Sequence, residues 1–235
     1  MKLLKETESF RLHGKWYGDA CGTAFGLEVL GERWSMLIVR ELLTGPRRFS
    51  DIRASLPGIS AKVLTERLEG LAQWGVIERR ELPPPAASRI YELTAWGRAA
   101  EPAIMELGRW AAQSVMHDPN LPLSAASLMT SMKTMQLPAL ADAPDMAIGM
   151  VVGGEEHRVA IAKGVLDAMR GPVAGCDVVL RSATARTIAG ALYADIPVAA
   201  LEAEDGLVVE GDRGLLSRFL ALFALPPKLD CPASA

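Results

Sequence analysis

Apolar residues recur at intervals of three and four through the first half of the chain, which is the spacing of amphipathic helices. The pattern predicts helices over Gly22–Leu30 and Arg33–Leu43, with Gly31 interrupting between them. It also predicts a short helix over Asp51–Ser55 and a longer one over Ala61–Trp74. This part of the chain is therefore predicted to be mainly helical.

Capping and turn residues set the limits of the two later helices. Ser50 and Ser60 each stand just before a predicted helix, where a serine oxygen can accept a free backbone N–H. Pro57-Gly58 predicts a tight turn between the two helices, and Gly75 predicts the end of the second one. The stretch is thus a compact pair of helices joined by a turn.

A hairpin follows this helix pair. Residues Val76–Leu82 and Arg89–Leu93 alternate as strands, and the proline-rich run between them predicts a stiff loop. Thr94 then caps a further helical segment, which is kinked or begins again at Pro102. The order of helix, helix, short helix, turn, helix, hairpin and helix is that of a winged helix-turn-helix.

Basic residues gather around this unit, where they can contact nucleic-acid phosphates. The exposed N-terminal face of Ala61–Trp74 is predicted to enter a major groove, with Lys62 and Thr65 at its start. Arg47 and Arg48 either hold phosphates or belong to a solvated loop, and Arg67 contacts either a phosphate or a carboxylate of the protein. The full set of candidate DNA contacts is Arg47, Arg48, Ser50, Ser60, Lys62, Thr65, Arg67, Arg79, Arg80 and Arg89.

The spaced motif across residues 21–112 resembles the HxlR-type transcriptional regulators. The matching residues are Cys21, Leu30, Gly31, Trp34, Arg40, Glu41, Leu42, Leu43, Gly45, Arg48, Phe49, the run Leu56–Ser60, Lys62, Leu64, Arg67, Leu68, Leu71, Gly75 and Arg79, with the segment "YELTAWGRA" after the hairpin. The resemblance implies a homodimer that binds double-stranded DNA and is joined largely by its terminal helices.

Two features depart from that family's pattern. The family often begins with Cys-Pro, and in some members this cysteine senses oxidants or electrophiles; here the residues are Cys21-Gly22. Cys21 is therefore either a redox sensor or an ordinary helix-cap residue. The hairpin loop carries the unusual run Pro83–Ala87, which changes how a wing can reach a minor groove.

The second half of the chain has a different residue pattern, which predicts short apolar strands separated by glycine-rich turns. A helix is predicted first, over the segment "AASLMTSMKTMQL". The predicted strands are "MAIGMVV", "HRVAIAKG", "VLDAMRG", "CDVVLRS" and "GLVVEGD", and the predicted helices are "SATARTIAGALYAD" capped by Ser182, "PVAALEAED" and "RGLLSRFLALFAL" capped by Asp212. We expect an α+β domain whose antiparallel sheet is covered by helices.

This half resembles the sterol-carrier-protein-type lipid-binding domains over about 146–225. The resemblance rests on the segments "CDVVLRS" and "LVVEGD" and on the helix that begins at Ile196-Pro197. It implies a tunnel for an apolar effector, or a copy that its own side chains fill. The candidate ligand-binding residues are Leu180, Ile188, Leu192, Leu216, Phe219 and Phe223.

Composition narrows the class of protein further. The net charge of the 235 residues is -3, but residues 1–118 carry 16 basic and 15 acidic residues, against 9 and 13 in residues 119–235. The positive charge is thus local, as a specific DNA-binding module needs. Three scattered cysteines and three scattered histidines give no metal-ligand cluster, and no apolar run is long enough to cross a membrane. No signal peptide is expected at the N-terminus. The scattered and odd-numbered cysteines suit reduced thiols, so that a cytoplasmic location is expected.

These observations predict a cytoplasmic DNA-binding regulator without a cofactor. Its domains are expected at 1–118 for DNA binding and dimerisation, 119–145 for a linker with a helix, and 146–235 for a sterol-carrier-like unit. An enzyme is not expected, because no nucleophile and base pair or phosphate loop appears. The rival interpretation is a lipid or acyl-group carrier whose helical half only contacts other proteins.

Overall fold

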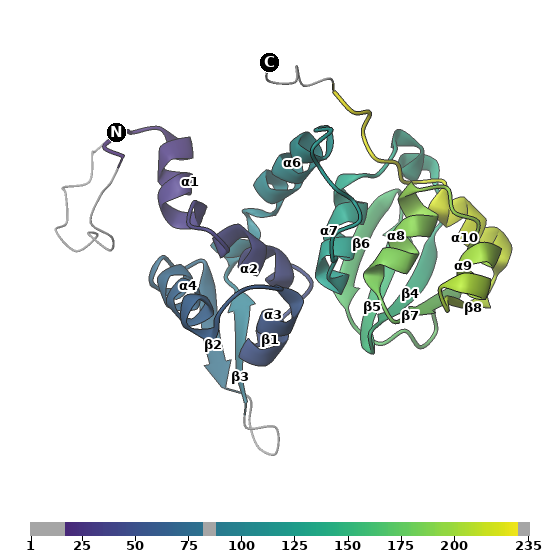
Figure 1. Ribbon diagram of the computed structural model, residues 1–235, viewed down its shortest axis with the longest axis horizontal. Coiled ribbons are helices and arrows are strands. Elements are labelled where there is room, and N and C mark those ends of the chain that lie inside the picture. Colours follow the sequence, from purple (N-terminus) through teal and green to yellow (C-terminus); the bar gives the residue numbers. More distant parts are fainter. Residues whose placement is uncertain (1–16, 82–87, 230–235) are drawn as a thin grey trace.

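Two hydrophobic cores organise the chain. The computed structural model describes residues 17–81 and 88–229, and Figure 1 shows a helical part with a small sheet beside a larger sheet with several helices. One cluster of buried side chains runs from Val29 to Leu93 and the other from Ala125 to Phe223. The N-terminal segment, the loop run Pro83–Ala87 and Cys231 lie outside the described residues. In the part of the chain that is described, no helix is long and apolar enough to cross a membrane.

The first part is a helical unit with a three-stranded sheet. Its helices are α1 (Gly22–Leu30), α2 (Ser35–Leu42), α3 (Phe49–Ser55), α4 (Ala61–Gln73), α5 (Ala95–Arg98) and α6 (Glu101–Ala112). Its strands are β1 (Arg47–Arg48), β2 (Ile77–Glu81) and β3 (Arg89–Leu93), in the antiparallel order β1-β3-β2. The order of elements is that of the predicted winged helix-turn-helix.

Helix α4 forms as its sequence predicts. Its three leucines, Leu64, Leu68 and Leu71, are buried in the first core. The Ser60 hydroxyl oxygen accepts the backbone N–H of Val63 at 3.2 Å, which confirms the predicted N-cap. Gly75 follows the helix with φ +73, a left-handed conformation in which glycine is least strained.

The start of α3 differs from the prediction. The helix begins at Phe49, so that Arg48 and not Ser50 occupies the N-cap position. The backbone N–H of Arg48 donates to the Asp51 carboxylate at 3.4 Å, and the Ser50 hydroxyl donates to the same side chain at 3.0 Å. Residues 47 and 48 are not a simple loop, because they form β1 and pair with β3.

The second part, called the second unit below, is a five-stranded sheet with helices; the helical part before it is called the first unit. Its strands are β4 (Met146–Val152), β5 (Glu155–Ala162), β6 (Val165–Arg170), β7 (Val178–Ser182) and β8 (Val208–Gly211), in the order β6-β5-β4-β7-β8. Its helices are α7 (Ala125–Thr134), α8 (Ala185–Tyr193), α9 (Val198–Glu204) and α10 (Arg213–Leu220), with a short 3-10 helix over Pro138–Asp142. The sheet is mixed, not purely antiparallel as predicted, because β4 and β7 pair in parallel.

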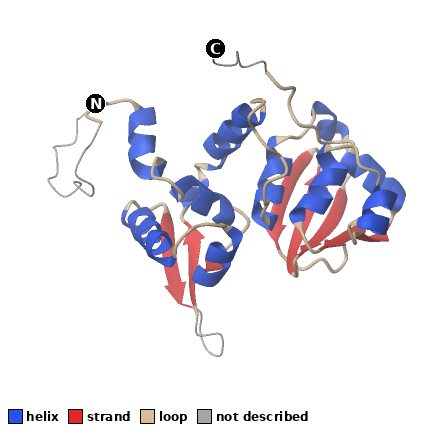
Figure 2. Ribbon diagram, viewed as in Figure 1, coloured by secondary structure: helices blue, strands red, loops and turns tan. Residues whose placement is uncertain are grey.

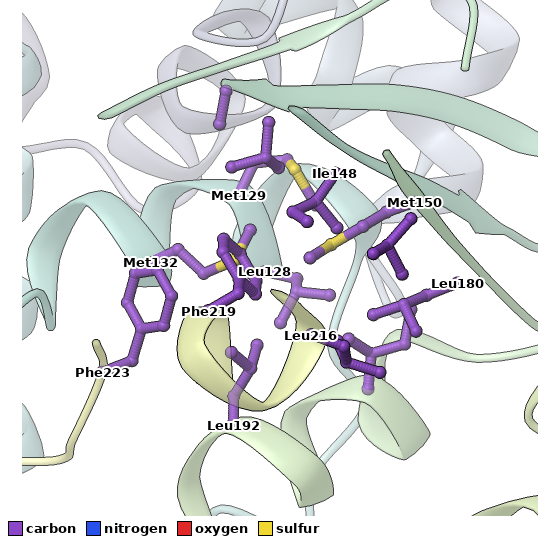
Figure 3. Close-up of a cluster of buried hydrophobic side chains, with 14 of the residues drawn as sticks. Leu128, Met129, Met132, Ile148, Met150, Leu180, Leu192, Leu216, Phe219 and Phe223 are labelled. Atoms are coloured by element: carbon purple, nitrogen blue, oxygen red, sulfur yellow. The ribbon is translucent and has the colours of Figure 1, made fainter. Parts of the chain in front are cut away.

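The helices of this part pack on one face of its sheet (Figure 2). Ile148 and Met150 of β4 point into this core, where they meet side chains from α7, α8 and α10 (Figure 3). Gly149 alternates with them and points to the opposite face, where Val173 packs; a Cβ on Gly149 would approach the Val173 Cβ to 2.6 Å. The second face of the central strand is therefore covered at Gly149.

The segment 119–145 contributes to this core. Helix α7 buries Leu128, Met129 and Met132 in the second cluster, and Leu140 of the 3-10 helix joins them. The Ser124 hydroxyl oxygen accepts the backbone N–H of Ser127 at 3.0 Å and caps α7. The segment expected to be a linker thus packs as an integral part of the second unit.

Two predicted helix caps in the second unit have different outcomes. Asp212 caps α10, since its carboxylate accepts the backbone N–H of Leu215 at 3.0 Å. Helix α8 instead begins after Thr184, and Ser182 is the last residue of β7. The predicted cap by Ser182 is therefore wrong, although its hydroxyl oxygen accepts the backbone N–H of Thr184 at 3.3 Å.

Candidate nucleic-acid interface

The polar face of α4 is exposed while its apolar face anchors it. The Lys62 side chain is 86% exposed and lies 3.9 Å from Glu66, one helical turn later. The exposed Thr65 hydroxyl donates to the carbonyl of Ala61 at 3.0 Å. Since an exposed ion pair at this distance holds its partners only weakly, Lys62 can turn toward a ligand. Ser60 is exposed at the same end of the helix.

Exposed arginines line the hairpin beside α4. Arg79 and Arg80 lie on β2 and Arg89 lies on β3. Arg80 contacts Glu92 across the strands at 2.5 Å, and Arg89 contacts Glu81 at 3.3 Å. The carboxylates offset part of the positive charge, so that the hairpin is less basic than its arginines alone suggest.

Arg67 takes the structural role that the sequence left open. Its guanidinium donates to Glu32 at 2.8 Å and to the carbonyl of Arg33 at 3.1 Å. Both partners lie in the turn between α1 and α2. Arg67 therefore ties α4 to that turn, and the alternative of an internal ion pair describes it better than a phosphate contact.

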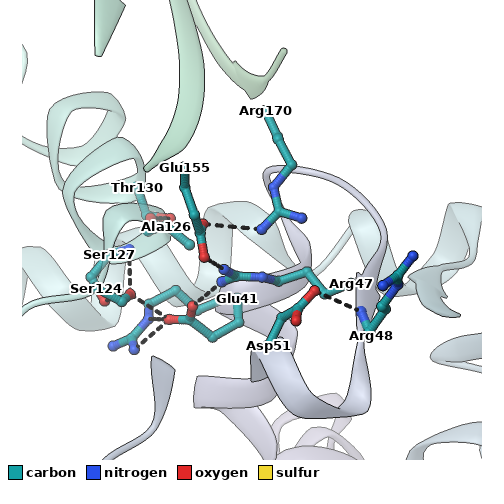
Figure 4. Close-up of polar contacts among 11 residues, drawn as sticks. Glu41, Arg47, Arg48, Asp51, Ser124, Ala126, Ser127, Thr130, Glu155 and Arg170 are labelled. Atoms are coloured by element: carbon teal, nitrogen blue, oxygen red, sulfur yellow. Dashed lines mark hydrogen bonds and ion pairs between the residues drawn. The ribbon is translucent and has the colours of Figure 1, made fainter. Parts of the chain in front are cut away.

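Arg47 is the clearest departure from the predicted set. Its side chain is 1% exposed and lies between Glu41 of α2 and Glu155 of β5, at 2.6 and 2.5 Å (Figure 4). A guanidinium that is buried and paired in this way is not available to a phosphate. The predicted DNA contact at Arg47 is therefore wrong, whereas its neighbour Arg48 is exposed.

The carboxylate that holds Arg47 is itself fully buried. Glu41 accepts hydrogen bonds from the Arg40 guanidinium at 2.9 Å and from the Ser124 hydroxyl at 2.7 Å, besides the one from Arg47. A buried carboxylate requires such partners. The sequence analysis gave Glu41 no structural role, but a signal was present: Glu41 lies on the same helical face as the buried Ile38.

Two more side chains extend this junction between the units. Glu155 also accepts from the Arg170 guanidinium at 3.0 Å, and the Arg170 backbone N–H donates to the carbonyl of Thr44 at 2.8 Å. His157, two residues further along β5, is fully buried, and neither of its ring nitrogens has a hydrogen-bond partner among the described residues. Burial lowers the pKa of His157 to about 4, against the opposing attraction of Glu155.

Cys21 occupies the N-cap position of α1 and is exposed. The backbone N–H of Thr23 lowers the pKa of the Cys21 thiol, helped by the Thr23 hydroxyl and the backbone N–H of Ala24. A helix N-terminus stabilises a thiolate in this way. Cys176, by contrast, is partly buried, and desolvation raises the pKa of its thiol.

The candidate ligand-binding residues of the second unit all lie in its packed core. Leu180, Ile188, Leu192, Leu216, Phe219 and Phe223 are each at most 5% exposed. The Phe219 and Phe223 rings meet edge to face at 5.0 Å between centroids, and Figure 3 shows Met132 and Leu128 beside them. An apolar ligand would have to displace some of these side chains.

The first unit therefore has the fold of a helix-turn-helix protein, with an exposed polar face on α4. The HxlR-like helix-turn-helix family model matches residues 29–119. The HTH-type transcriptional regulator YodB of Bacillus subtilis is 43% identical over 91 residues, which are 39% of this chain and 80% of YodB. YvaP of the same organism, also described as an HTH-type transcriptional regulator, is 41% identical over 87 residues, or 37% of this chain and 81% of YvaP.

The chain belongs to the HxlR-like helix-turn-helix family of transcriptional regulators through these residues. Among solved structures, the reduced form of YodB is 37% identical, with a TM-score of 0.39, and the alignment covers 43% of this chain and all of that one. The relatives named here correspond to the first unit of this protein. The second unit is additional to what they match.

Proposed function

We propose that this transcriptional regulator reads an inverted-repeat operator as a homodimer, with α4 as the recognition helix. The observation that carries the proposal is the division of α4 into a buried leucine face and an exposed face that begins with Ser60, Lys62 and Thr65. A helix anchored in this way can enter a major groove without losing its packing.

The exposed basic residues around α4 divide into two proposed roles. Lys62 and Thr65 lie at the N-terminal end of the recognition helix and read base edges. Arg48 at the start of α3 and the hairpin residues Arg79, Arg80 and Arg89 hold phosphates, which position the protein without reading sequence. This assignment leaves out Arg47 and Arg67, since both are occupied by carboxylates of the protein.

An exposed apolar surface on α1 and α6 supports the homodimer. Phe25 of α1 is 42% exposed, and Leu107 and Trp110 of α6 are 44% and 70% exposed. Phe25 also lies 6.5 Å from the ring of Trp96, so that the aromatic surface continues from α1 onto α5. A second copy of the chain that covers these residues would bury apolar area that water now contacts.

Selection of bound sequences from a random duplex pool tests the proposal. The expected product is an inverted repeat whose half-sites lie about one helical turn apart. A pool without a dyad, or binding without sequence preference at physiological salt, would overturn it and would leave the lipid-carrier interpretation as the better one.

A redox role for Cys21 is a second candidate. Solved relatives include YodB in a quinone-bound form, 37% identical, and the redox regulator HypR in an oxidized form, 28% identical. In this chain, the exposure of Cys21 and its lowered thiol pKa support the same kind of chemistry. Oxidant treatment should then change operator affinity in the wild-type protein and not in Cys21→Ser.

The remaining assignments stay predictions. We propose units that meet near residue 118, with the segment 119–145 belonging to the second, and a cytoplasmic location. The sterol-carrier resemblance and an apolar effector are supported by the sheet covered with helices, but an effector must open the core around Phe219 and Leu216. Native mass spectrometry and titration with fatty acids test this, since a ligand that binds the native state raises its stability.

A further inference from the structure

Helix α6 packs against the first core near one end and contacts α7 of the second unit. Ile104 packs against the first cluster of buried residues, while Ala112 is buried at the other end of the helix. Figure 1 shows α6 above α2 and next to α7. The exposed stripe that carries Leu107 and Trp110 lies between the two ends. The orientation of this stripe therefore depends on what holds the ends of α6.

A lysine of the second unit holds the first end. The Lys133 ammonium of α7 donates to the Glu101 carboxylate in the first turn of α6 at 3.0 Å, and it also lies 3.4 Å from Asp167 of β6. The Lys133 side chain is only 16% exposed, and that of Glu101 is 21% exposed. Because both groups are largely removed from water, this ion pair restrains α6 more than an exposed pair would.

A second lysine holds the opposite end. The Lys228 ammonium donates to the carbonyls of Ala112 and Ser114, each at 2.9 Å, and the backbone N–H of Leu229 donates to the carbonyl of Gln113 at 2.8 Å. The last carbonyls of a helix lack donors within the helix, and a cation there also complements the helix dipole. The donor to the Ala112 carbonyl at the end of α6 thus comes from a residue 116 positions later in the chain.

We propose that Lys133 and Lys228 are positioning residues through which the second unit fixes the angle of α6 and so the half-site spacing that the regulator accepts. The inference rests on the proposed homodimer, in which Leu107 and Trp110 meet a second copy. If α6 is rigid relative to α4, the two recognition helices of the dimer are held at one separation and rotation. Each added base pair turns a half-site by about 35° about the DNA axis, which a rigid dimer cannot follow.

The test is a series of duplexes in which the selected half-sites are moved apart or together one base pair at a time. The wild-type protein is expected to lose affinity by about tenfold per base pair on either side of the optimum. Lys133→Met combined with Lys228→Met should bind the optimum duplex with little change but lose only about threefold per base pair. Lys228→Arg, which keeps a cation for the two carbonyls, should retain the sharp optimum in the otherwise unchanged chain.

Arg181→Met is the matched control. It breaks an ion pair with Glu210 that lies within the second unit and is exposed on both sides, and it should keep the sharp spacing optimum. An equally sharp optimum in the double lysine variant would overturn the inference. Failure of the wild-type protein itself to bind any half-site pair would instead refute the proposed DNA-binding homodimer.

Hydrogen exchange gives a second readout that needs no DNA. The backbone amides in the last turn of α6 should exchange at least several times faster in Lys228→Met than in the wild-type protein, because local opening is no longer opposed by the cap. Lys228→Arg should restore slow exchange. Unchanged exchange in Lys228→Met would show that the contact does not restrain α6, and would also overturn the inference.

Discussion

Arg47 donates a hydrogen bond to Glu155, a residue 108 positions later in the chain, at 2.5 Å. The second nitrogen of the same guanidinium donates to Glu41 at 2.6 Å. One buried arginine therefore joins the strand at the base of the wing to the sheet of the second unit. Because the guanidinium is planar and forked, its two terminal nitrogens donate to the two carboxylates in fixed directions, whereas a lysine has one nitrogen for both.

Removing this guanidinium should destabilise the protein strongly. Arg47→Met leaves the fully buried Glu41 carboxylate without its partner from β1, and breaking a buried pair in this way costs about 3–5 kcal/mol. Urea unfolding measures the loss. The control Arg181→Met breaks an exposed pair and should cost less than about 1 kcal/mol. Similar losses in the two variants would contradict a buried, energetically important junction.

His157 should make the folded state sensitive to mild acid. Burial lowers its pKa to about 4, so that between about pH 6.5 and pH 4 the unfolded chain binds a proton that the folded chain does not. Stability is therefore present above the unfolded pKa and falls as the pH falls, by about 2 kcal/mol at about pH 5. Urea unfolding of the wild-type protein and of His157→Leu at about pH 7.5 and pH 5 should show this extra loss only in the wild type.

Cys21 should be the more reactive of the two described cysteines. The hydrogen bonds from Thr23 lower the pKa of its thiol, while burial raises that of Cys176. At neutral pH, iodoacetamide should therefore modify Cys21 first, as peptide mass spectrometry can follow. Thr23→Val, which removes the hydroxyl but keeps the backbone N–H, should slow the reaction. Faster labelling of Cys176 would contradict this account.

Mutations should distinguish the residues that read bases from the residues that bind phosphates. Lys62→Ala or Thr65→Ala should cost roughly 1–3 kcal/mol on the selected operator and flatten its base preference. Arg48→Ala should weaken selected and random duplexes alike and reduce the slope of log affinity against log salt by about one.

Arg218→Ala, on the exposed surface of α10, is the matched loss of a charge far from the proposed groove and should change neither property. If Arg48→Ala alters base preference while Lys62→Ala leaves it intact, the groove face of the protein has been assigned to the wrong element.

The sequence predicted those features that depend on neighbouring residues. Helix α4, its Ser60 cap and the stop at Gly75 follow from local spacing and from backbone conformations that few residues adopt. Strand β1 could not be predicted from local spacing, because two residues carry no periodicity. Its pairing with β3 also joins residues that are distant along the chain. Arg47 was misassigned for a similar reason, since only the fold brings Glu155 to it.

The core of the second unit marks a different limit of sequence reasoning. The stripe of apolar residues on α10 was expected, and Leu216 and Phe219 are buried as that stripe predicts. The pattern could not decide between a filled core and a tunnel, because both bury the same side chains against the same sheet. Only the packing of Met129 and Met132 of α7 against Phe219 of α10 and the neighbouring Phe223 distinguishes a filled core from a tunnel.

The number of chains on one operator tests the central claim most directly. Sedimentation of the purified protein with a labelled duplex selected from the random pool, at physiological salt, should give two chains per duplex on an inverted repeat. A duplex with one half-site scrambled should bind far more weakly, because the two-fold contacts are then halved. One chain per duplex, or equal binding to the scrambled duplex, would contradict a homodimeric regulator that reads DNA with α4.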